Sequence, residues 1–456
     1  MSLPSAAPAF ALPPSLPELA AVDFKPPKGE RVVLDNGMVV YLMRDNTLPV
    51  VHMTAYIRTG KLNDPLEKIG LGELTAGLLK DGGTLKYRPD EIDKTLEFLA
   101  ASVDTHIGIE EARADLTSLK KDLDTVLDIY AEVLMRPAFS PDKVNLRRTE
   151  TLEMIRRRND NPGRAAVREA LRSFYGPAHP YGWRSEEATV KAVTIEDMRA
   201  YHANYYRPNN IILAVAGDFA SYEEMIAKLK AKFGAWPRGK VKFPVIPPVQ
   251  IRDKRQVFHM EKDIAQAYIV ILQKGLKRHD PLEYPLTVTN EILGGGLSSR
   301  LASEIRSRQG LAYTVYSYSA KKPDLGYSLA YCGTNPATTA RALTEMLRQY
   351  ALLTREACPA EEVARARDSI VNSFVFRFPT PFELITERAS FEYYGYTADY
   401  LDNYVENIAR TDSKSVLETS QNLFKPEDAM IFVIGNSKKF DKPLSGFGPV
   451  TELKED

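Results

Sequence analysis

Alternating apolar and polar positions predict three β-strands at the start of the globular part of the chain. The segment RVVLDNGMVVYLMRD has two apolar runs on either side of Asn36-Gly37, a dipeptide typical of tight β-hairpin turns. VVHMTAYIRTG, which ends at Gly60, alternates as a third strand. Further strands are expected at about 102–108, 112–119 and 210–217.

Apolar residues at three- and four-residue spacing predict helices between these strands. In PLEKIGLGELTAGLLKDGG (65–83), Leu71, Leu74 and Leu78 share one face, and Gly82-Gly83 provides the stop. The other helices of the first half are expected at about 90–101, 123–135, 141–159, 163–175 and 194–206. Strands that alternate with helices of this length indicate an α+β fold.

The second half of the chain repeats this plan. YYRPNNIILAVAGDF is echoed by LFKPEDAMIFVIGNS, so that Pro208 and Pro426 stand 218 residues apart, as do Gly217 and Gly435. The strand AQAYIVILQ followed by the helix PLEYPLTVTNEILGG repeats the strand-then-helix order of the first half. We therefore predict two homologous α/β-sandwich domains produced by an internal duplication.

Composition places the boundaries between these parts. Residues 1–28 are rich in Pro and Ala and predict an extended arm, followed by an N-terminal domain at 29–235. The segment 236–253, WPRGKVKFPVIPPVQIRD, contains four prolines and predicts an extended linker to a C-terminal domain at 254–456. We expect the two domains to hinge about this linker.

Charge and composition narrow the classes of function. The 60 basic and 60 acidic side chains cancel, so no overall field favours a nucleic acid or an anionic membrane. No apolar run reaches 18 residues, so no membrane span is expected. The two cysteines, Cys332 and Cys358, are too few for a disulfide framework, and the sequence leaves open whether they pair.

The beginning of the chain leaves two cellular compartments open. MSLPSAAPAFALPPSLPELA lacks a basic start, its prolines interrupt the apolar run that a secretory signal needs, and the first basic residue is Lys25. Such a segment fits the lead of an exported protein or a disordered lead of a cytoplasmic one. We expect a periplasmic location, with the cytoplasm as the alternative.

The stretch LGGGLSSRLASEIRSRQGLAYTVYS, from Leu293 to Ser317, carries the densest candidate chemistry. Three glycines precede a helix expected at 300–308, which Gly310 closes as a left-handed residue. A strand follows from Tyr313, and its alternation places Tyr313, Val315 and Ser317 on one side.

Arg306 and Tyr313 are the candidate functional residues of this stretch. The helix and the strand fold a guanidinium and a phenol towards each other, and two such donors could bind a carbonyl oxygen or an oxyanion. On the pattern alone a structural interpretation competes. An arginine near a helix C-terminus often complements the helix dipole, and a tyrosine that opens a strand often serves packing.

The same 25 residues closely resemble the C-terminal-half motif of the pitrilysin/insulinase family of zinc metallopeptidases, which includes the mitochondrial processing peptidases. In that family an arginine and a tyrosine seven positions later, the R/Y pair, assist peptide binding and turnover at a zinc site in the other half. Arg306 and Tyr313 fall on those two positions. The resemblance implies that they support substrate binding and the transition state.

The first half resembles the zinc-binding part of the family but lacks its functional residues. Zinc-bearing members carry HxxEH, as in GLAHFLEHML, where this chain reads GLGELTAGLL. The zinc histidines correspond to Glu73 and Gly77, the general base to Ala76, and the third ligand to Met154. One carboxylate and a thioether cannot make a zinc site. We therefore expect no metal in this chain.

The resemblance implies the non-zinc subunit of a heterodimeric zinc metalloendopeptidase, inactive alone and paired with an HxxEH-bearing homologous subunit that holds the zinc. The substrates would be peptides or unfolded segments. The alternative is a catalytically inert assembly subunit, like the core proteins of respiratory complexes. Motifs for other chemistries are missing: Gly294–Gly296 is no phosphate loop, no GxSxG elbow occurs, and no basic, aromatic-interleaved patch suggests nucleic-acid binding.

Overall fold

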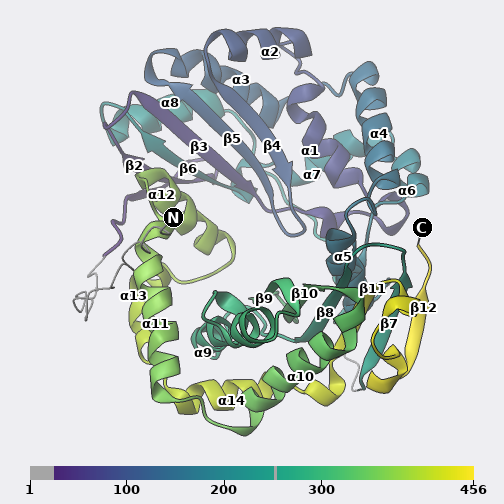
Figure 1. Cartoon of the computed structure of the whole chain (residues 1–456). Coiled ribbons are helices and arrows are strands. Elements are labelled where there is room, and N and C mark those ends of the chain that lie inside the picture. The colour runs from purple at the N-terminus through teal and green to yellow at the C-terminus, as the bar shows by residue number, and fades with distance from the viewer. Residues whose placement is uncertain (1–24, 251–253, 456) are drawn as a thin grey trace, which may run out of the picture.

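The computed structural model describes residues 25–250 and 254–455, which form two halves, each built on one six-stranded mixed sheet (Figure 1). The strands of the first sheet, in spatial order, are β1 (Glu30–Val33), β2 (Val39–Arg44), β6 (Ile211–Gly217), β3 (Val50–Ile57), β5 (Ala112–Leu119) and β4 (Ser102–Ile107). Those of the second are β12 (Val450–Leu453), β7 (Gln256–Glu261), β11 (Met430–Gly435), β8 (Ala267–Lys274), β10 (Tyr327–Thr334) and β9 (Ala312–Ala320).

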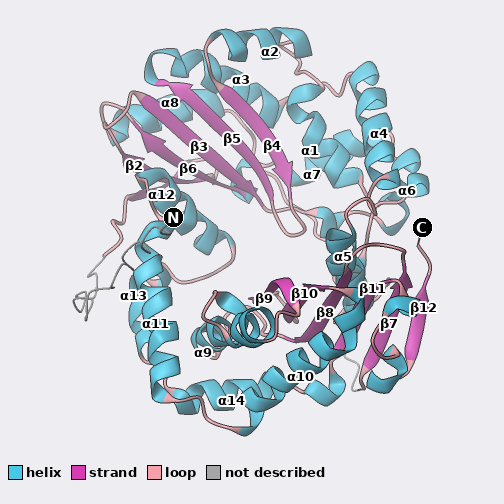
Figure 2. Ribbon diagram, viewed as in Figure 1, coloured by secondary structure: helices cyan, strands magenta, loops and turns pink. Residues whose placement is uncertain are grey.

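Helices surround both sheets (Figure 2). Those of the first half are α1 (Leu71–Asp81), α2 (Pro89–Phe98), α3 (Leu123–Met135), α4 (Pro141–Arg156), α5 (Pro162–Tyr175), α6 (Glu187–Ala192), α7 (Ile195–Tyr205) and α8 (Tyr222–Phe233). Those of the second are α9 (Glu283–Asn290), α10 (Thr339–Arg355), α11 (Ala360–Phe374), α12 (Pro381–Tyr393), α13 (Tyr400–Ala409) and α14 (Ser413–Leu423). Two wide π-helical segments, Glu291–Gly295 and Ala302–Arg308, lie between α9 and β9.

The order of the strands confirms the duplicated α+β fold. Strands β2 to β6 of the first sheet occupy the same relative places as β7 to β11 of the second. Strand β6 runs parallel to β2 and antiparallel to β3. In the same way, β11 runs parallel to β7 and antiparallel to β8. The halves differ at one edge, where β1 runs antiparallel to β2 but β12 runs parallel to β7.

Local signals placed most elements of the first half correctly. The predicted hairpin is present, with Gly37 at φ 85° between the antiparallel strands β1 and β2. The helix expected at 65–83 is shorter than predicted, because Gly70 adopts φ 110° and the α-helical turns begin only at Leu71. A left-handed residue ends any regular helix that precedes it.

Each sheet is covered on one face by a helix from the other half of the chain. Ile385 and Ala389 of α12 are buried against Ala214 of β6, in the first sheet. Reciprocally, Ala166 of α5 is buried against Val270 of β8, in the second sheet. Figure 1 shows α12 beside β2 and β6, and α5 beside β8.

This exchange of helices opposes the expected hinge about the linker, which stays a prediction. Opening such a hinge would expose two apolar cores, and the burial of apolar surface contributes most of the free energy that holds folded chains together. Charged groups add to the contact, since Glu110, at the turn between β4 and β5, pairs with Arg278 and Lys322 of the second half, each at 2.5 Å. Residues 236–250 contain no helix or strand, and 251–253 lie outside the described residues. The domain boundaries therefore stay predictions.

The end of the predicted N-terminal arm is held against the second half, while its first 24 residues lie outside the described part. Arg388 of α12 donates hydrogen bonds to the carbonyl oxygens of Pro26 and Pro27, both at 2.9 Å. Within 25–250 and 254–455, no helix combines the length and apolarity that a membrane crossing requires. The periplasmic location stays a prediction.

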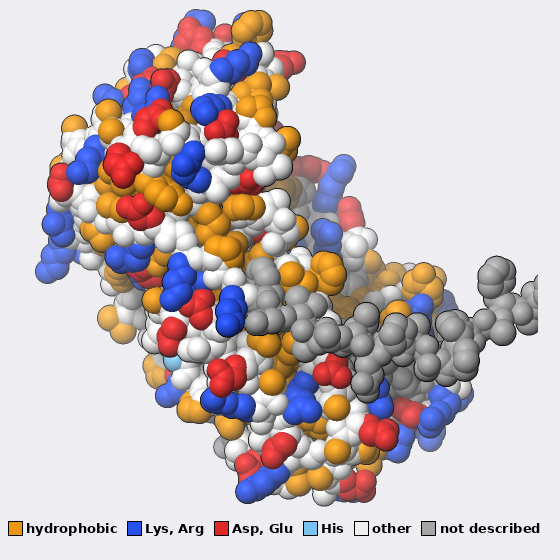
Figure 3. Space-filling view, turned by 90° about the vertical axis from the view of Figure 1, so that its left-hand side faces the viewer, with side chains coloured by type: hydrophobic (Ala, Val, Ile, Leu, Met, Phe, Trp, Pro, Cys, Tyr) orange, Lys and Arg blue, Asp and Glu red, His pale blue; other side chains and the backbone are white. Residues whose placement is uncertain are grey.

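The surface carries both signs of charge. On the face drawn in Figure 3, Lys and Arg side chains are interspersed with Asp and Glu, in keeping with the equal numbers of basic and acidic residues. An interspersed surface focuses no field on a polyanion. This face therefore offers no electrostatic footprint for a nucleic acid.

Candidate functional site

The turn that leads into β9 is built on glycines, as the sequence predicted. A Cβ atom on Gly294 would lie 2.5 Å from the backbone nitrogen of Ser317, so only glycine lets the chain approach β9 this closely. Gly310 adopts φ 62°, and the backbone N–H of Leu311 then donates to the carbonyl of Ile305 at 2.8 Å. The expected left-handed helix end is confirmed, although the helix itself winds in wide π turns.

A β-bulge on strand β9 places Tyr313 in solvent. Thr334 of β10 pairs with Ala312 and the preceding residue, Gly333, pairs with Thr314, so Tyr313 is an extra residue in the ladder. Ala312 is buried in the core of the second half, and Val315 packs against the same core. Tyr313, by contrast, is 79% exposed. The prediction that Tyr313 shares one side with Val315 and Ser317 is therefore wrong, because the bulge breaks the alternation.

Arg306 and Tyr313 do lie together. The guanidinium carbon of Arg306 stands 5.4 Å from the centroid of the Tyr313 ring, a cation–π contact. Both side chains are exposed. The contact holds a five-donor guanidinium beside a phenolic hydroxyl at a surface that a ligand can reach.

Glu73 and Met154, two of the four positions that align with the zinc site, line one open hollow in the first half. The Glu73 carboxylate pairs with the ammonium of Lys61, with 3.0 Å between Oε2 and Nζ. Met154, on α4, is 53% exposed. Ala76 is buried on α1, where its carbonyl oxygen accepts a hydrogen bond from the Thr105 hydroxyl at 2.6 Å.

The fourth position, Gly77, is covered by an arginine that the sequence reasoning missed. The guanidinium of Arg147 donates to the Gly77 carbonyl at 3.3 Å and pairs with Asp81 at 2.6 Å. A Cβ atom on Gly77 would lie only 3.1 Å from Nε of Arg147. Arg147 precedes Met154 by seven residues, two turns of α4, and this spacing was the available signal.

Asp64, a second residue that the sequence reasoning missed, fixes the start of α1. Its buried carboxylate accepts from the backbone N–H groups of Gly70 and Gly72, both at 2.8 Å. Burial nevertheless raises the pKa of Asp64 to about 7, because the surroundings disfavour its charge more than the two N–H groups favour it. Helix α1 is thus anchored by the protein itself.

These residues do not fit a zinc ion. Zinc sites in proteins use three or four donors from Cys, His, Asp or Glu, and here the one carboxylate is already paired with an ammonium. Arg147 places a further positive charge beside α1. In the described part of the chain, no cluster of three or more His, Cys, Asp or Glu side chains could hold a metal.

The two cysteines are both free and buried. Cys358 lies under Arg300, whose guanidinium stands 3.3 Å from the sulfur, and burial raises the pKa of its thiol to about 11. The pairing that the sequence left open is thereby decided, since Cys332 and Cys358 form no disulfide with each other.

The chain has two homologous α+β halves. On the helix after the third strand, the metal-binding positions are occupied by unsuitable side chains. These features define a peptidase-like chain whose own metal site is incomplete. The family model "Insulinase (Peptidase family M16)" matches residues 39–179, and the model "Peptidase M16 inactive domain" matches residues 192–370. Together these matches span more than half of the chain. The chain belongs to peptidase family M16, and the resemblance found in the sequence is confirmed.

Proteins similar in sequence or in structure carry different names. The uncharacterized zinc protease YmxG of Bacillus subtilis is 23% identical over 413 residues, which cover 89% of this chain and 98% of that protein. The non-peptidase homolog YmxG of Helicobacter pylori is 20% identical over 398 residues, which cover 85% of this chain and 89% of that protein. A solved M16 inactive domain from Pseudomonas fluorescens superimposes with a TM-score of 0.83 at 22% identity, covering 91% of this chain and 99% of that one.

Proposed function

We propose that this chain is the non-zinc subunit of a two-chain zinc metalloendopeptidase and that Arg306 and Tyr313 act on peptide bound at the partner's metal site. One observation carries the proposal: the pair is held together in solvent by a bulge and a cation–π contact. A tyrosine that served only packing would be buried, but this one is 79% exposed. The unsuitable donors on α1 support a metal held by another chain.

The chemistry of the pair suits a peptide carbonyl. The Tyr313 hydroxyl and the Arg306 N–H groups can each donate to the carbonyl oxygen of a bound peptide bond. As water attacks the carbonyl carbon, negative charge develops on that oxygen, and both hydrogen bonds strengthen in the transition state. When bound, the zinc of the partner would supply the activated water.

The substrates under this proposal are peptides or unfolded segments. Donors aimed at a backbone carbonyl recognise a group that every residue carries, so they favour extended peptide over any one side chain. The partner is an HxxEH-bearing M16 chain, which makes the active complex a heterodimer. The name of the Helicobacter pylori relative, a non-peptidase homolog, is compatible with a chain that is inactive alone.

The test is reconstitution with HxxEH-bearing M16 chains from the same cell. Co-expressed partners are expected to co-elute with this chain as a one-to-one complex that cleaves peptide faster than either chain alone. Tyr313→Phe and Arg306→Ala are expected to lower turnover and leave the complex intact. Arg308→Ala is the matched control, because Arg308 is exposed in the same helical segment and pairs with Glu304 instead, at 2.8 Å.

The alternative function, a catalytically inert assembly subunit, predicts a different result. The complex would form, but its peptidase activity would not respond to Tyr313→Phe or Arg306→Ala. A partner that stayed separate at micromolar concentration and was fully active unaided would refute the heterodimer.

A further inference from the structure

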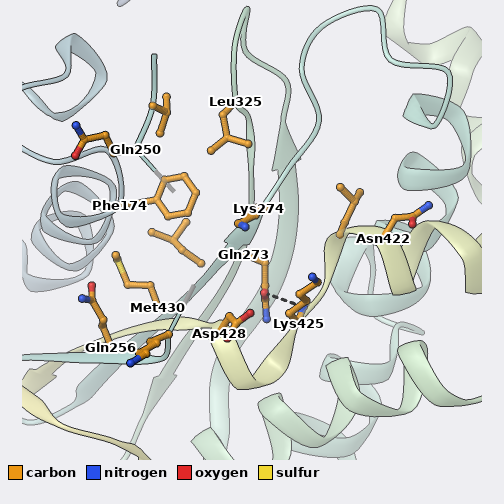
Figure 4. Close-up of a pocket in the computed structure, with 14 residues that line it drawn as sticks. Phe174, Gln250, Gln256, Gln273, Lys274, Leu325, Asn422, Lys425, Asp428 and Met430 are labelled. Atoms are coloured by element: carbon orange, nitrogen blue, oxygen red, sulfur yellow. Dashed lines mark hydrogen bonds between the residues drawn. The ribbon is translucent and has the colours of Figure 1, made fainter. Parts of the chain in front are cut away.

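A cavity lies in the second half, away from α1 and from the Arg306–Tyr313 pair. It sits where the second sheet meets α5 and the end of α14, it is open on one side, and its volume is about 100 Å³ (Figure 4). No residue assigned above to the proposed peptidase chemistry lines it.

One wall of the cavity is apolar. Phe174 of α5, Leu272 of β8 and Met430 of β11 contribute to it, and Figure 4 shows the ring of Phe174 turned into the space. Leu272 and Met430 belong to the core that the two halves share. These side chains stand on packed helix and strands, so the wall is preformed and suits an apolar body of about the size of an aromatic ring.

A buried amide at the cavity has an unused donor. Gln273 is 4% exposed, and its Oε1 accepts a hydrogen bond from the backbone N–H of Lys425 at 3.2 Å. Because a backbone N–H can only donate, this bond identifies the other end of the side chain as the NH₂ group. That Nε2 has no hydrogen-bond partner among the described residues. Buried donors are nearly always paired, so the amide indicates an acceptor that arrives with a ligand.

The charged residues around the cavity favour an anion. Lys254 and Lys425 line it, against one carboxylate, Asp428. Lys425, whose backbone N–H orients Gln273, also lines the cavity. Positive side chains and an N–H donor on one side, with an apolar wall on the other, match an amphipathic anion.

We propose that this cavity binds a small carboxylate with an apolar body. The body packs against Phe174, Leu272 and Met430, and the carboxylate accepts hydrogen bonds from Gln273 and Lys425. A free aryl or branched carboxylic acid and the C-terminal residue of a short peptide share this chemistry. The proposal is independent of the peptidase function proposed above.

Titration calorimetry on the full chain tests the carboxylate directly. N-acetyl-phenylalanine is expected to bind at one saturable site at least about tenfold more tightly than N-acetyl-phenylalaninamide, which has the same body without the charge. Equal affinity for the two compounds, or no binding of the acid at about 10 mM, would overturn the proposal.

Variants then locate the site. Gln273→Glu keeps an oxygen for the Lys425 N–H but puts a negative charge where Nε2 stands, so it is expected to weaken binding of the acid at least about tenfold. Lys425→Met and Phe174→Ala are expected to weaken it as well, and they keep the test valid if Gln273→Glu does not fold. The control is Lys438→Met, since Lys438 lies outside the cavity. Full affinity in all three cavity variants would place the binding elsewhere and refute the site.

Two further probes separate the sources of the ligand. 3-Phenylpropionate represents a free acid, and Gly-Gly-Phe represents a peptide C-terminus. Tighter binding of the tripeptide would identify a site for peptide ends, and tighter binding of 3-phenylpropionate a site for free acids. Binding of neither compound would overturn the proposal.

Discussion

Helix α1 and strand β9 lie in the two homologous halves of one chain, and their candidate chemistry has opposite surroundings. At α1, the Glu73 carboxylate is paired with Lys61, and Gly77 is covered by the guanidinium of Arg147. At β9, a bulge turns Tyr313 outward, where the Arg306 guanidinium lies over its ring. The first region satisfies its polar groups internally, whereas the second presents them to solvent.

Contacts within the protein account for the position of α1. Structural metal sites often supply the free energy that folds the segment around them. Here the two backbone N–H groups bound by Asp64 and the Thr105 hydrogen bond to Ala76 hold α1 in place. The first half can therefore keep its architecture while the proposed chemistry resides in the second.

The largest expected effect is on turnover by the reconstituted complex. Tyr313→Phe or Arg306→Ala removes a donor to the developing oxyanion, so kcat is expected to fall by ~10²–10³, equivalent to about 2.7–4 kcal/mol. Steady-state kinetics at saturating peptide, with the complex verified by size-exclusion chromatography, measures it. Full activity in either variant would show that the exposed pair has no catalytic part.

A smaller effect concerns the packing behind α1 and depends on pH. His202, on α7, donates from Nε2 to the Leu134 carbonyl at 2.9 Å, and burial lowers its pKa from 6.5 to about 4. The unfolded chain therefore binds a proton between these values that the folded chain does not. The free energy of unfolding is expected to fall as pH drops from about 6.5 to 4, by at most about 3 kcal/mol.

Denaturant titrations at several pH values, with His202→Gln as the comparison, measure this contribution. The variant should lose the part of the pH dependence that is due to the imidazole, since glutamine does not titrate and keeps an N–H donor. An identical pH dependence in both proteins would show that His202 is not the group responsible.

The next effect is expected to be small. Glu73→Gln removes the ion pair with Lys61, but both side chains are more than a third exposed, so the free energy of unfolding should change by less than about 1 kcal/mol. Turnover of the complex should stay at the wild-type value, because Glu73 has no metal to bind. A loss comparable to that of Tyr313→Phe would assign α1 a direct part in the reaction.

The smallest expected effect is on metal content. The isolated chain, purified without chelator, is expected to contain no stoichiometric zinc and to cleave no peptide, alone or as a homodimer, because its donors do not fit the ion. Elemental analysis and a peptide assay, with the HxxEH-bearing partner as the positive control, check both. One zinc per chain would contradict the comparison between α1 and β9.

Much of this was available from the sequence because it depends on neighbours along the chain. Hydrophobic periodicity and turn residues predicted the hairpin at Gly37, the helix end at Gly310 and the duplicated order of strands and helices. A spacing of seven residues across a helix end and a strand start predicted that Arg306 and Tyr313 meet. Local rules suffice where a short segment and its turn determine the geometry.

Only the tertiary structure decided the remaining features, since each depends on residues distant in sequence. Helices α5 and α12 each cover the apolar face of the sheet in the other half. Both sheets offer the same kind of apolar face, so the sequence alone does not say which helix covers which sheet. The outward turn of Tyr313 depends on the register of β9 against β10. The guanidinium of Arg147 reaches Gly77 across 70 residues. Periodicity reports which face of an element is apolar, but packing selects its partner.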